Sequence, residues 1–117
     1  MQKQDIAEIN EIEKLAQIMA KAINPKKIYL FGSFARGEQK ESSDYDFYIV
    51  VDDEDNSLCE LNGRVETAVG FKRKRPLDIL VVSEGYFNDK LRDNWPVEQQ
   101  VKREGVLLYE RIGKKMA

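Results

Sequence analysis

The chain has 117 residues, a net charge of −2, no histidine and one cysteine, Cys59. This length predicts a single domain, residues 1–117, with room for a core but not for a second substrate-binding domain. Without histidine, and with one cysteine, the chain cannot by itself build a His/Cys zinc site or a Ser-His or Cys-His nucleophile pair. Any catalysis must rest on carboxylates, hydroxyls, lysine, arginine, backbone donors or a hard metal ion.

The acidic balance, with an isoelectric point near 5.3, argues against strong nucleic-acid binding. The sequence shows no signal peptide and no apolar run long enough to cross a bilayer, so no membrane partner is expected. A lone cysteine allows no internal disulfide, which suits a reducing compartment. These features together predict a cytoplasmic protein.

Hydrophobic periodicity and turn residues divide the chain into alternating helices and strands. The predicted elements are a helix over 5–22, a strand over 27–31, a short helix over 34–38, a strand over 45–51, a helix from 57 to about 71, a strand over 76–82, a helix from 83 to about 91, a helix from 96 to 104 and a strand over 106–109. This order predicts an α/β (α+β) fold, a small mixed sheet flanked by helices.

Several polar residues are placed to cap these helices. Asp5 with Glu8 and Ser57 with Glu60 have the spacing of capping boxes. Ser33 and Ser83 each precede a helical segment and can cap it in the same way. In the last two helices we expect apolar side chains to face inward, and they are Tyr86, Phe87, Leu91, Val97 and Val101.

Two charged loops are best explained without a function. The acidic run 52–56 lacks the spacing and the glycine of a calcium loop, which favours a solvated turn. The basic run 72–75 could touch phosphates or an acidic partner, but a solvated loop is the favoured interpretation.

Three carboxylates lie among apolar residues and need an explanation, because ionised groups are costly there unless paired or metal-bound. Asp44 and Asp46 point to the same side at the start of a strand, and Asp78 can join them if its strand lies alongside. Asp78 alone would also suit an edge strand. Hard divalent cations would relieve the repulsion, and two magnesium ions could hold a triphosphate and activate an attacking hydroxyl.

The turn after the first strand supplies groups suited to phosphate. Gly32 lets the backbone approach a phosphate closely, and Ser33 with the following amides lies at a helix N-terminus, which favours anions. Arg36 lies one turn later and could neutralise phosphate or pair with a nearby aspartate. Each feature alone is common in structural roles, so only their joint occurrence in this order points to a function.

The ordered set resembles a known superfamily. Gly32-Ser33, ten residues, Asp44-x-Asp46 and a later Asp78 resemble the polymerase-beta-like nucleotidyltransferases. Gly-Ser-Phe-Ala-Arg-Gly followed by Ser-Asp-Tyr-Asp is similar to the minimal nucleotidyltransferase (MNT) domains of prokaryotes. The resemblance runs over 28–82 and again over the ending 104–110.

The resemblance implies transfer of AMP from ATP to a hydroxyl, with two Mg²⁺ ions and release of pyrophosphate. It makes Asp44 and Asp46 metal ligands and Asp78 the third ligand, which could also take the acceptor proton. By the same resemblance Gly32 and Ser33 hold the triphosphate, while Arg36 binds phosphate or forms a structural salt bridge. Many such domains are antitoxins that add AMP to a tyrosine of a HEPN ribonuclease toxin.

Other functions stay open at this point. The chain could be a binding module that masks its partner without catalysis, although the carboxylate set argues against this. It could act on a small molecule such as an antibiotic hydroxyl, with a homodimer completing the cleft. Template-directed polymerisation is least favoured, because the chain has no room for domains that grip a duplex.

Overall fold

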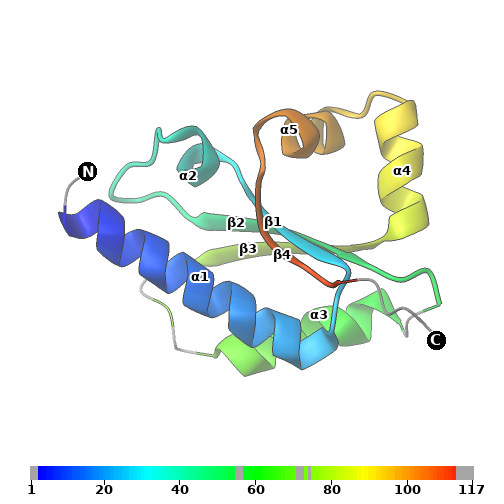
Figure 1. Ribbon diagram of the computed structural model, residues 1–117, viewed down its shortest axis with the longest axis horizontal. Helices are drawn as coiled ribbons and strands as arrows, with labels where there is room; N and C mark the ends of the chain where they lie inside the picture. The colour runs from blue at the N-terminus through cyan, green and yellow to red at the C-terminus, as the bar shows by residue number, and fades with distance from the viewer. Residues whose placement is uncertain (1–2, 55–56, 71–72, 74, 113–117) are drawn as a thin grey trace.

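The computed structural model describes residues 3–54, 57–70, 73 and 75–112, of which 3–6 are described as backbone only. Figure 1 shows the arrangement of the helices and strands. In chain order they are α1 (Lys3–Ile23), β1 (Lys27–Phe31), α2 (Ser33–Arg36), β2 (Tyr45–Val51), α3 (Leu58–Val69), β3 (Leu77–Ser83), α4 (Glu84–Arg92), α5 (Pro96–Glu104) and β4 (Val106–Glu110). The predicted order of elements is therefore confirmed.

The four strands form one mixed sheet in the order β3-β2-β1-β4. β1 pairs antiparallel with both β2 and β4, whereas β2 and β3 run parallel. A parallel pair needs a crossover connection, and α3 provides it. The predicted fold class, a small mixed sheet flanked by helices, is confirmed.

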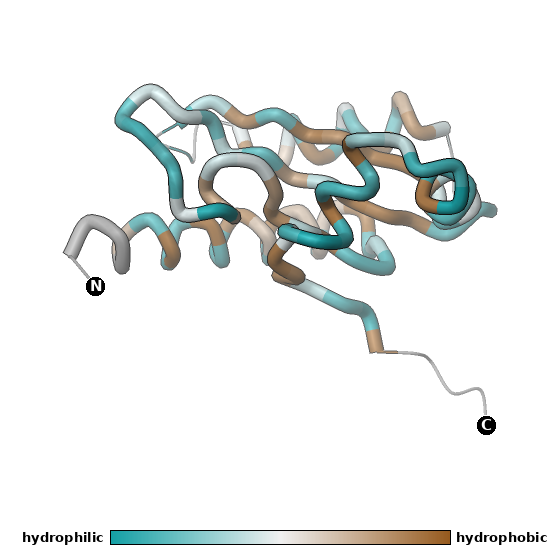
Figure 2. The backbone as a smooth tube through the Cα atoms, turned by 90° about the horizontal axis from the view of Figure 1, so that it is seen from above, coloured by the Kyte–Doolittle hydropathy of each residue, from teal (hydrophilic) through white to brown (hydrophobic). Residues whose placement is uncertain are grey.

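Helices cover both faces of the sheet (Figure 1). α1 and α3 pack on one face, and α4 and α5 pack on the other. In the tube of Figure 2 the strands are mostly hydrophobic and the connecting loops mostly hydrophilic. This division follows from burial, because a strand covered on both faces gains from apolar residues at nearly every position.

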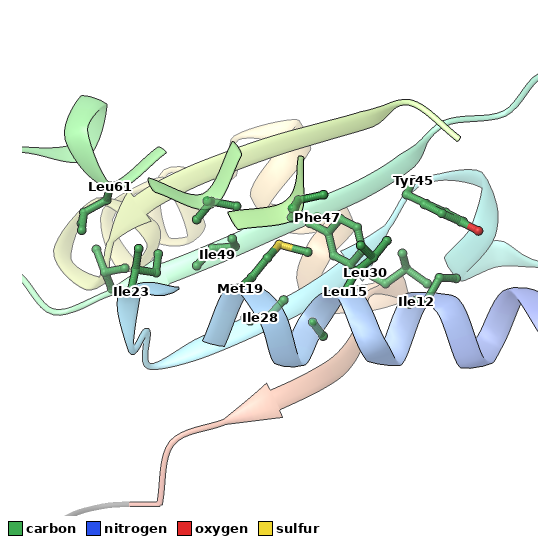
Figure 3. Close-up of a cluster of buried hydrophobic side chains, with 14 residues drawn as sticks. Ile12, Leu15, Met19, Ile23, Ile28, Leu30, Tyr45, Phe47, Ile49 and Leu61 are labelled. Atoms are coloured by element: carbon green, nitrogen blue, oxygen red, sulfur yellow. The ribbon is translucent and has the colours of Figure 1, made fainter. Parts of the chain in front are cut away.

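β2 is the centre of the structure, since six of its seven residues are buried. Its alternate side chains enter two separate clusters, as the pleat requires. Tyr45, Phe47 and Ile49 pack with α1 and α3. Figure 3 shows these side chains facing Leu15 and Met19 of α1. Tyr48 and Val50 pack with Val82, Phe87 and Val101 on the opposite face.

Two of the predicted helix caps are wrong. The backbone is already helical from Lys3, so Asp5 lies inside α1 rather than at its start. Ser33 is the first residue of α2, and Gly32 takes the cap position at a φ of 81° without a side-chain hydrogen bond. The caps at Ser57 and Ser83 are confirmed, because each side chain accepts a hydrogen bond from a backbone amide in the first helical turn.

The inward faces of the last two helices were predicted only in part. Phe87, Leu91 and Val101 pack against the sheet as expected. Tyr86 and Val97 do not, since they are 42% and 40% exposed. On α5 the buried position next to Val101 belongs instead to Glu98, which is 2% exposed.

The charged loops are solvated only in part: Asp53 and Glu54 form an exposed turn as predicted, and Asp55 and Asn56 lie outside the described residues. Asp52 accepts two hydrogen bonds from Arg111, at 2.9 and 2.8 Å, and so ties the end of β2 to the end of β4. Arg75 is directed inward rather than toward solvent. Phe71, Lys72 and Lys74 lie outside the described residues. Among the described helices none is long and apolar enough to cross a membrane.

Candidate active site

The parallel pairing of β2 and β3 brings two of the predicted carboxylates together. Asp46 and Asp78 are direct partners in the register of the two strands. Both lie on the face that carries Tyr48 and Val82, because side chains alternate along each strand. Asp44 is exposed and precedes β2, two residues before Asp46. The expectation that the strand of Asp78 lies beside that of Asp46 is confirmed.

The carboxyl of Asp46 has an unusual protonation equilibrium. Partial burial, followed by the nearby charges of Asp78 and Asp44, raises its pKa to about 6, while Arg36 opposes the shift. Asp46 is therefore within electrostatic reach of both Asp44 and Asp78. A site of this kind favours a bound cation, because a cation removes both the repulsion and the cost of burying the charge.

Gly32 is required at its position for two reasons. Its φ of 81° lies in the left-handed region, which side chains rarely adopt. A Cβ atom there would also collide with Oδ2 of Asp46. The Gly-Ser turn therefore lies directly against this carboxylate.

Arg36 lies at the end of α2 and forms ion pairs with two glutamates. Its Nε is 2.9 Å from Glu38, and its Nη1 is 3.6 Å from Glu104 on α5. The structure contains the structural salt bridge, although its partners are glutamates rather than the predicted aspartate. The guanidinium still lowers the pKa of Asp46, so its charge also acts on the carboxylate site.

The sheet face around the two strand carboxylates is partly open. α4 and α5 cover Val82 near the far end of β3, Val50 near the far end of β2, and Tyr48 at the middle of β2. Between Val82 and Asp78 on the same face, Leu80 is 41% exposed, and Asp78 is exposed as well. A substrate can therefore approach Asp46 and Asp78 from the side that the helices leave uncovered.

The donor chemistry of this site fits a hard divalent cation. Carboxylate oxygens are the ligands that Mg²⁺ prefers in proteins. The pKa of Asp46 is raised first by partial burial and then by the charges of Asp78 and Asp44, and a bound cation would offset both effects. Within the described ranges, no three carboxylate, histidine or cysteine side chains are already arranged to hold a metal ion. Asp46 and Asp78 are register partners, whereas Asp44 is an exposed side chain that precedes the strand. Of the three candidate ligands, Asp44 is therefore the one whose placement is least determined by packing.

Two residues that support the site were not singled out in the sequence. The Tyr48 hydroxyl donates a hydrogen bond of 2.6 Å to the buried carboxylate of Glu98, which fastens α5 to the strand of Asp46. A signal for Glu98 was available, because it lies three residues before the buried Val101 and so shares its helix face. Arg75 was noted only as part of a basic run, and its partners are distant in sequence.

The sequence matches the family model described as polymerase beta, nucleotidyltransferase, over residues 13–113. The chain belongs to this family, and the predicted recognition and enzyme class are confirmed at this level. Two proteins of Methanocaldococcus jannaschii, each named "Putative protein adenylyltransferase", are similar to it. The first is 38% identical over 84 residues, 72% of this chain and 78% of that protein. The second is 38% identical over 72 residues, 57% of this chain and 72% of that protein.

Solved structures share the fold. A crystal structure of a "putative nucleotidyltransferase" from Sulfolobus solfataricus superposes with a TM-score of 0.57 at 20% identity, covering 92% of this chain and 84% of the other. A toxin–antitoxin structure with AMP-PNP gives a TM-score of 0.53 at 26% identity, covering 85% and 73%. The toxin–antitoxin pair MntA-HpeT, in a mutant form, gives 0.53 at 22%, covering 84% and 71%.

Proposed function

We propose that this chain is a metal-dependent adenylyltransferase that transfers AMP from ATP to a hydroxyl group. The acceptor in this proposal is the hydroxyl of a tyrosine in a partner HEPN toxin, so that the chain acts as an antitoxin. The observation that carries the proposal is the pair Asp46 and Asp78, which are register partners on adjacent parallel strands beside the Gly32 turn. The electrostatic coupling of Asp46 to Asp44 and Asp78 supports a cation site made of the same residues.

In this proposal Asp44, Asp46 and Asp78 hold magnesium, and two ions are expected. When bound, the metal would neutralise phosphate charge and polarise the reacting oxygens. The acceptor oxygen forms a bond to the α-phosphorus of ATP while the bond between that phosphorus and the bridging oxygen to the β-phosphate breaks. Pyrophosphate leaves with the bond's electron pair, and Asp78, on the open side of the pair, takes the proton of the acceptor hydroxyl.

Gly32 and Ser33 would hold the triphosphate, with Arg36 adding positive charge. Gly32 supports this role because it has no side chain. The turn can therefore lie close to Asp46, one of the proposed metal ligands. Arg36 is less free, since its guanidinium is engaged by Glu38 and Glu104. We therefore assign Arg36 to orienting α2 against α5 and to moderating the charge near Asp46.

The proposed partner follows from relatives rather than from this chain alone. The relatives in M. jannaschii carry the name of protein adenylyltransferases, and a structural neighbour is a toxin–antitoxin complex with an ATP analogue. A protein acceptor also suits a site on an open sheet face, because a large partner can supply the wall that this chain lacks.

The first experiment identifies the protein encoded by the gene next to that of this chain and measures its intact mass after incubation with this chain, ATP and Mg²⁺. We expect a gain of one or more AMP units, and we expect no gain with the Asp44→Ala/Asp46→Ala variant. Asp89→Ala, an exposed aspartate that pairs only at the surface with Arg92, is the matched control and should act as wild type.

Other outcomes would replace the proposal. A stable complex that silences the partner without any mass gain would favour a binding module that masks the toxin. No gain and no complex would favour a small-molecule acceptor such as an antibiotic hydroxyl. Asp78→Asn separately tests the proton-accepting role, which is wrong if that variant transfers AMP at the wild-type rate.

A further inference from the structure

Arg75 lies just before β3 and has one of the densest sets of polar contacts in the described chain. Its side chain is only 17% exposed, although it belongs to a sequence run that is basic throughout. It lies three residues before Asp78. Arg75 therefore belongs to the segment of backbone that leads directly into β3, the strand that carries Asp78.

The guanidinium is bound to the loop that precedes Asp44. Its Nη1 lies 3.2, 2.6 and 3.1 Å from the carbonyl oxygens of Lys40, Glu41 and Ser43. The loop is itself closed by two hydrogen bonds between Lys40 and Ser43, one to the Ser43 hydroxyl at 2.7 Å and one between backbone groups at 3.0 Å. Arg75 thus occupies the concave side of a turn that ends at Asp44.

The same side chain reaches two further elements. Nη2 forms an ion pair of 2.6 Å with Glu8 on α1. The guanidinium carbon lies 5.1 Å from the ring centre of Phe34 on α2. Next to it, the amide of Tyr45 donates to the carbonyl of Pro76 at 3.0 Å, which joins the start of β2 to the start of β3.

These contacts need an arginine in particular. A planar guanidinium presents its donors in several fixed directions at once, whereas a lysine ammonium is a single point charge on a flexible stem. Here the donors serve carbonyls on one side and a carboxylate on another, while the flat face covers an aromatic ring. A lysine at this position would keep the charge and lose most of the geometry.

We propose that Arg75 is a positioning residue that fixes Asp44 relative to Asp46 and Asp78, so that the three carboxylates can bind a divalent cation together. This inference rests on the proposed function for its catalytic meaning. The reason is physical: Asp46 and Asp78 are held by strand pairing, while Asp44 lies outside the strand and depends on its loop. Arg75 is the described side chain that anchors this loop to the strand of Asp78.

The test uses the full chain and its Arg75→Lys variant, which keeps the charge. Titration with Mn²⁺, followed by electron paramagnetic resonance of the free ion, should show affinity reduced roughly 10- to 100-fold, as for lost outer-shell partners. Hydrogen exchange of the amides of Ser43 and Tyr45 should be at least tenfold faster, because their loop has lost its anchor. The circular dichroism spectrum should stay that of the folded chain.

Two control variants separate positioning from general damage. Arg64→Lys changes an exposed arginine that pairs with Glu60 within α3 and should leave Mn²⁺ affinity and exchange unchanged. Glu8→Gln keeps an acceptor for Arg75 and should reduce Mn²⁺ affinity less than Arg75→Lys does. If Arg75→Lys binds Mn²⁺ as wild type does, the proposal is wrong, even where the loop exchanges faster.

Failure of the proposed function would be seen separately. If the wild-type chain transfers no AMP yet binds Mn²⁺ tightly, and Arg75→Lys weakens that binding, the positioning role stands and adenylyltransfer does not. If wild type transfers AMP and Arg75→Lys equals it in both rate and Mn²⁺ affinity, the function stands and the positioning role is overturned.

Discussion

At the scale of single residues, the site combines a turn that requires glycine with a partly buried, crowded carboxylate. Gly32 holds a backbone conformation that other residues avoid, and it does so in contact with Asp46. Asp46 is kept partly buried near two like charges, which is unfavourable in the absence of a cation. The crowded carboxylate costs stability and suits a bound cation, as is common where perturbed pKa values occur at functional sites.

Asp46→Asn should stabilise the metal-free protein at neutral pH. The pKa of Asp46 is near 3.8 in an unfolded chain and about 6 in the folded one, so the folded state binds more protons between these values. The contribution of this carboxyl to the stability of the folded protein is therefore most favourable below pH 4 and is lost as the pH rises through 6. Removing the charge should add about 1–2 kcal/mol at pH 7.5 and almost nothing at pH 4.

Urea denaturation in the presence of a chelator measures this difference at both pH values. Asp89→Asn, on an exposed helix surface, is the control and should change little at either pH. An Asp46→Asn variant that is no more stable than wild type at pH 7.5 would mean that neither burial nor the neighbouring carboxylates destabilise the charge of Asp46 as described.

Gly32→Ala should abolish the site while Gly63→Ala should not. The new Cβ at position 32 would meet the Asp46 carboxylate and would require a left-handed conformation, at a cost of at least about 1–2 kcal/mol. Gly63 lies within α3, and a Cβ there meets nothing within 4 Å, so alanine should stabilise by about 0.5–1 kcal/mol.

Thermal unfolding and AMP transfer, measured on both glycine variants, test this contrast. We expect the Gly32→Ala variant to lose at least about 100-fold in rate, since a shift of about 1 Å at a reacting centre has that effect. Wild-type activity in Gly32→Ala would show that the close approach of this turn to Asp46 has no functional role.

At the scale of elements, α5 is fastened to the sheet by one buried polar pair. Glu98 on α5 accepts from the hydroxyl of Tyr48, two residues along β2 from Asp46. Burial and the hydrogen bond to Glu98 raise the pKa of Tyr48, so the phenol remains the donor. The same helix carries Glu104, which contacts Arg36. α5 therefore contacts both β2, which carries Asp46, and α2, which follows the Gly32 turn.

Tyr48→Phe should destabilise the protein by about 1–3 kcal/mol, because the Glu98 carboxylate would stay buried after losing its phenol donor. Adding Glu98→Gln should recover part of this loss, since an uncharged amide is cheaper to bury. Denaturant unfolding of the two single variants and the double variant measures the coupling. Tyr86→Phe, at an exposed position on α4, should have little effect. Additive losses in the double variant would argue against the pair.

At the scale of the whole molecule, the helices cover both faces of the sheet but leave Asp78 and Leu80 exposed. A bound nucleotide and metal would contact residues from α2, β2 and β3 at once. Binding to the folded state alone should therefore stabilise the entire chain by mass action.

ATP with Mg²⁺, at about 100 times its dissociation constant, should add roughly 2.7 kcal/mol, which corresponds to about a 10 °C rise in Tm for a chain of this size. The shift should be absent in Asp44→Ala/Asp46→Ala and should disappear when the metal is chelated. Thermal melts with and without chelator measure it. An equal shift in the double variant would place the nucleotide elsewhere.

Much of this structure was predictable because it depends on local pattern. Apolar runs and turn residues located every strand, and the order of elements predicted a mixed sheet. The errors occurred where two neighbouring residues could take the same cap or buried position, and the local pattern does not show which of them does. Ser33 lost its capping role because Gly32 takes the left-handed cap position, and Val97 lost its buried position to Glu98, whose partner is 50 residues away.

The sequence by itself determined the family and the residue types available for chemistry, because the spacing of Gly32-Ser33, Asp44, Asp46 and Asp78 and the absence of histidine are properties of the chain alone. Only the tertiary structure decided that Asp46 and Asp78 face each other, that Gly32 contacts Asp46, and that Arg75 binds the loop of Asp44. The physical reason is that strand order, register and buried polar pairing depend on residues far apart in sequence, whose contacts form only when the sheet is assembled.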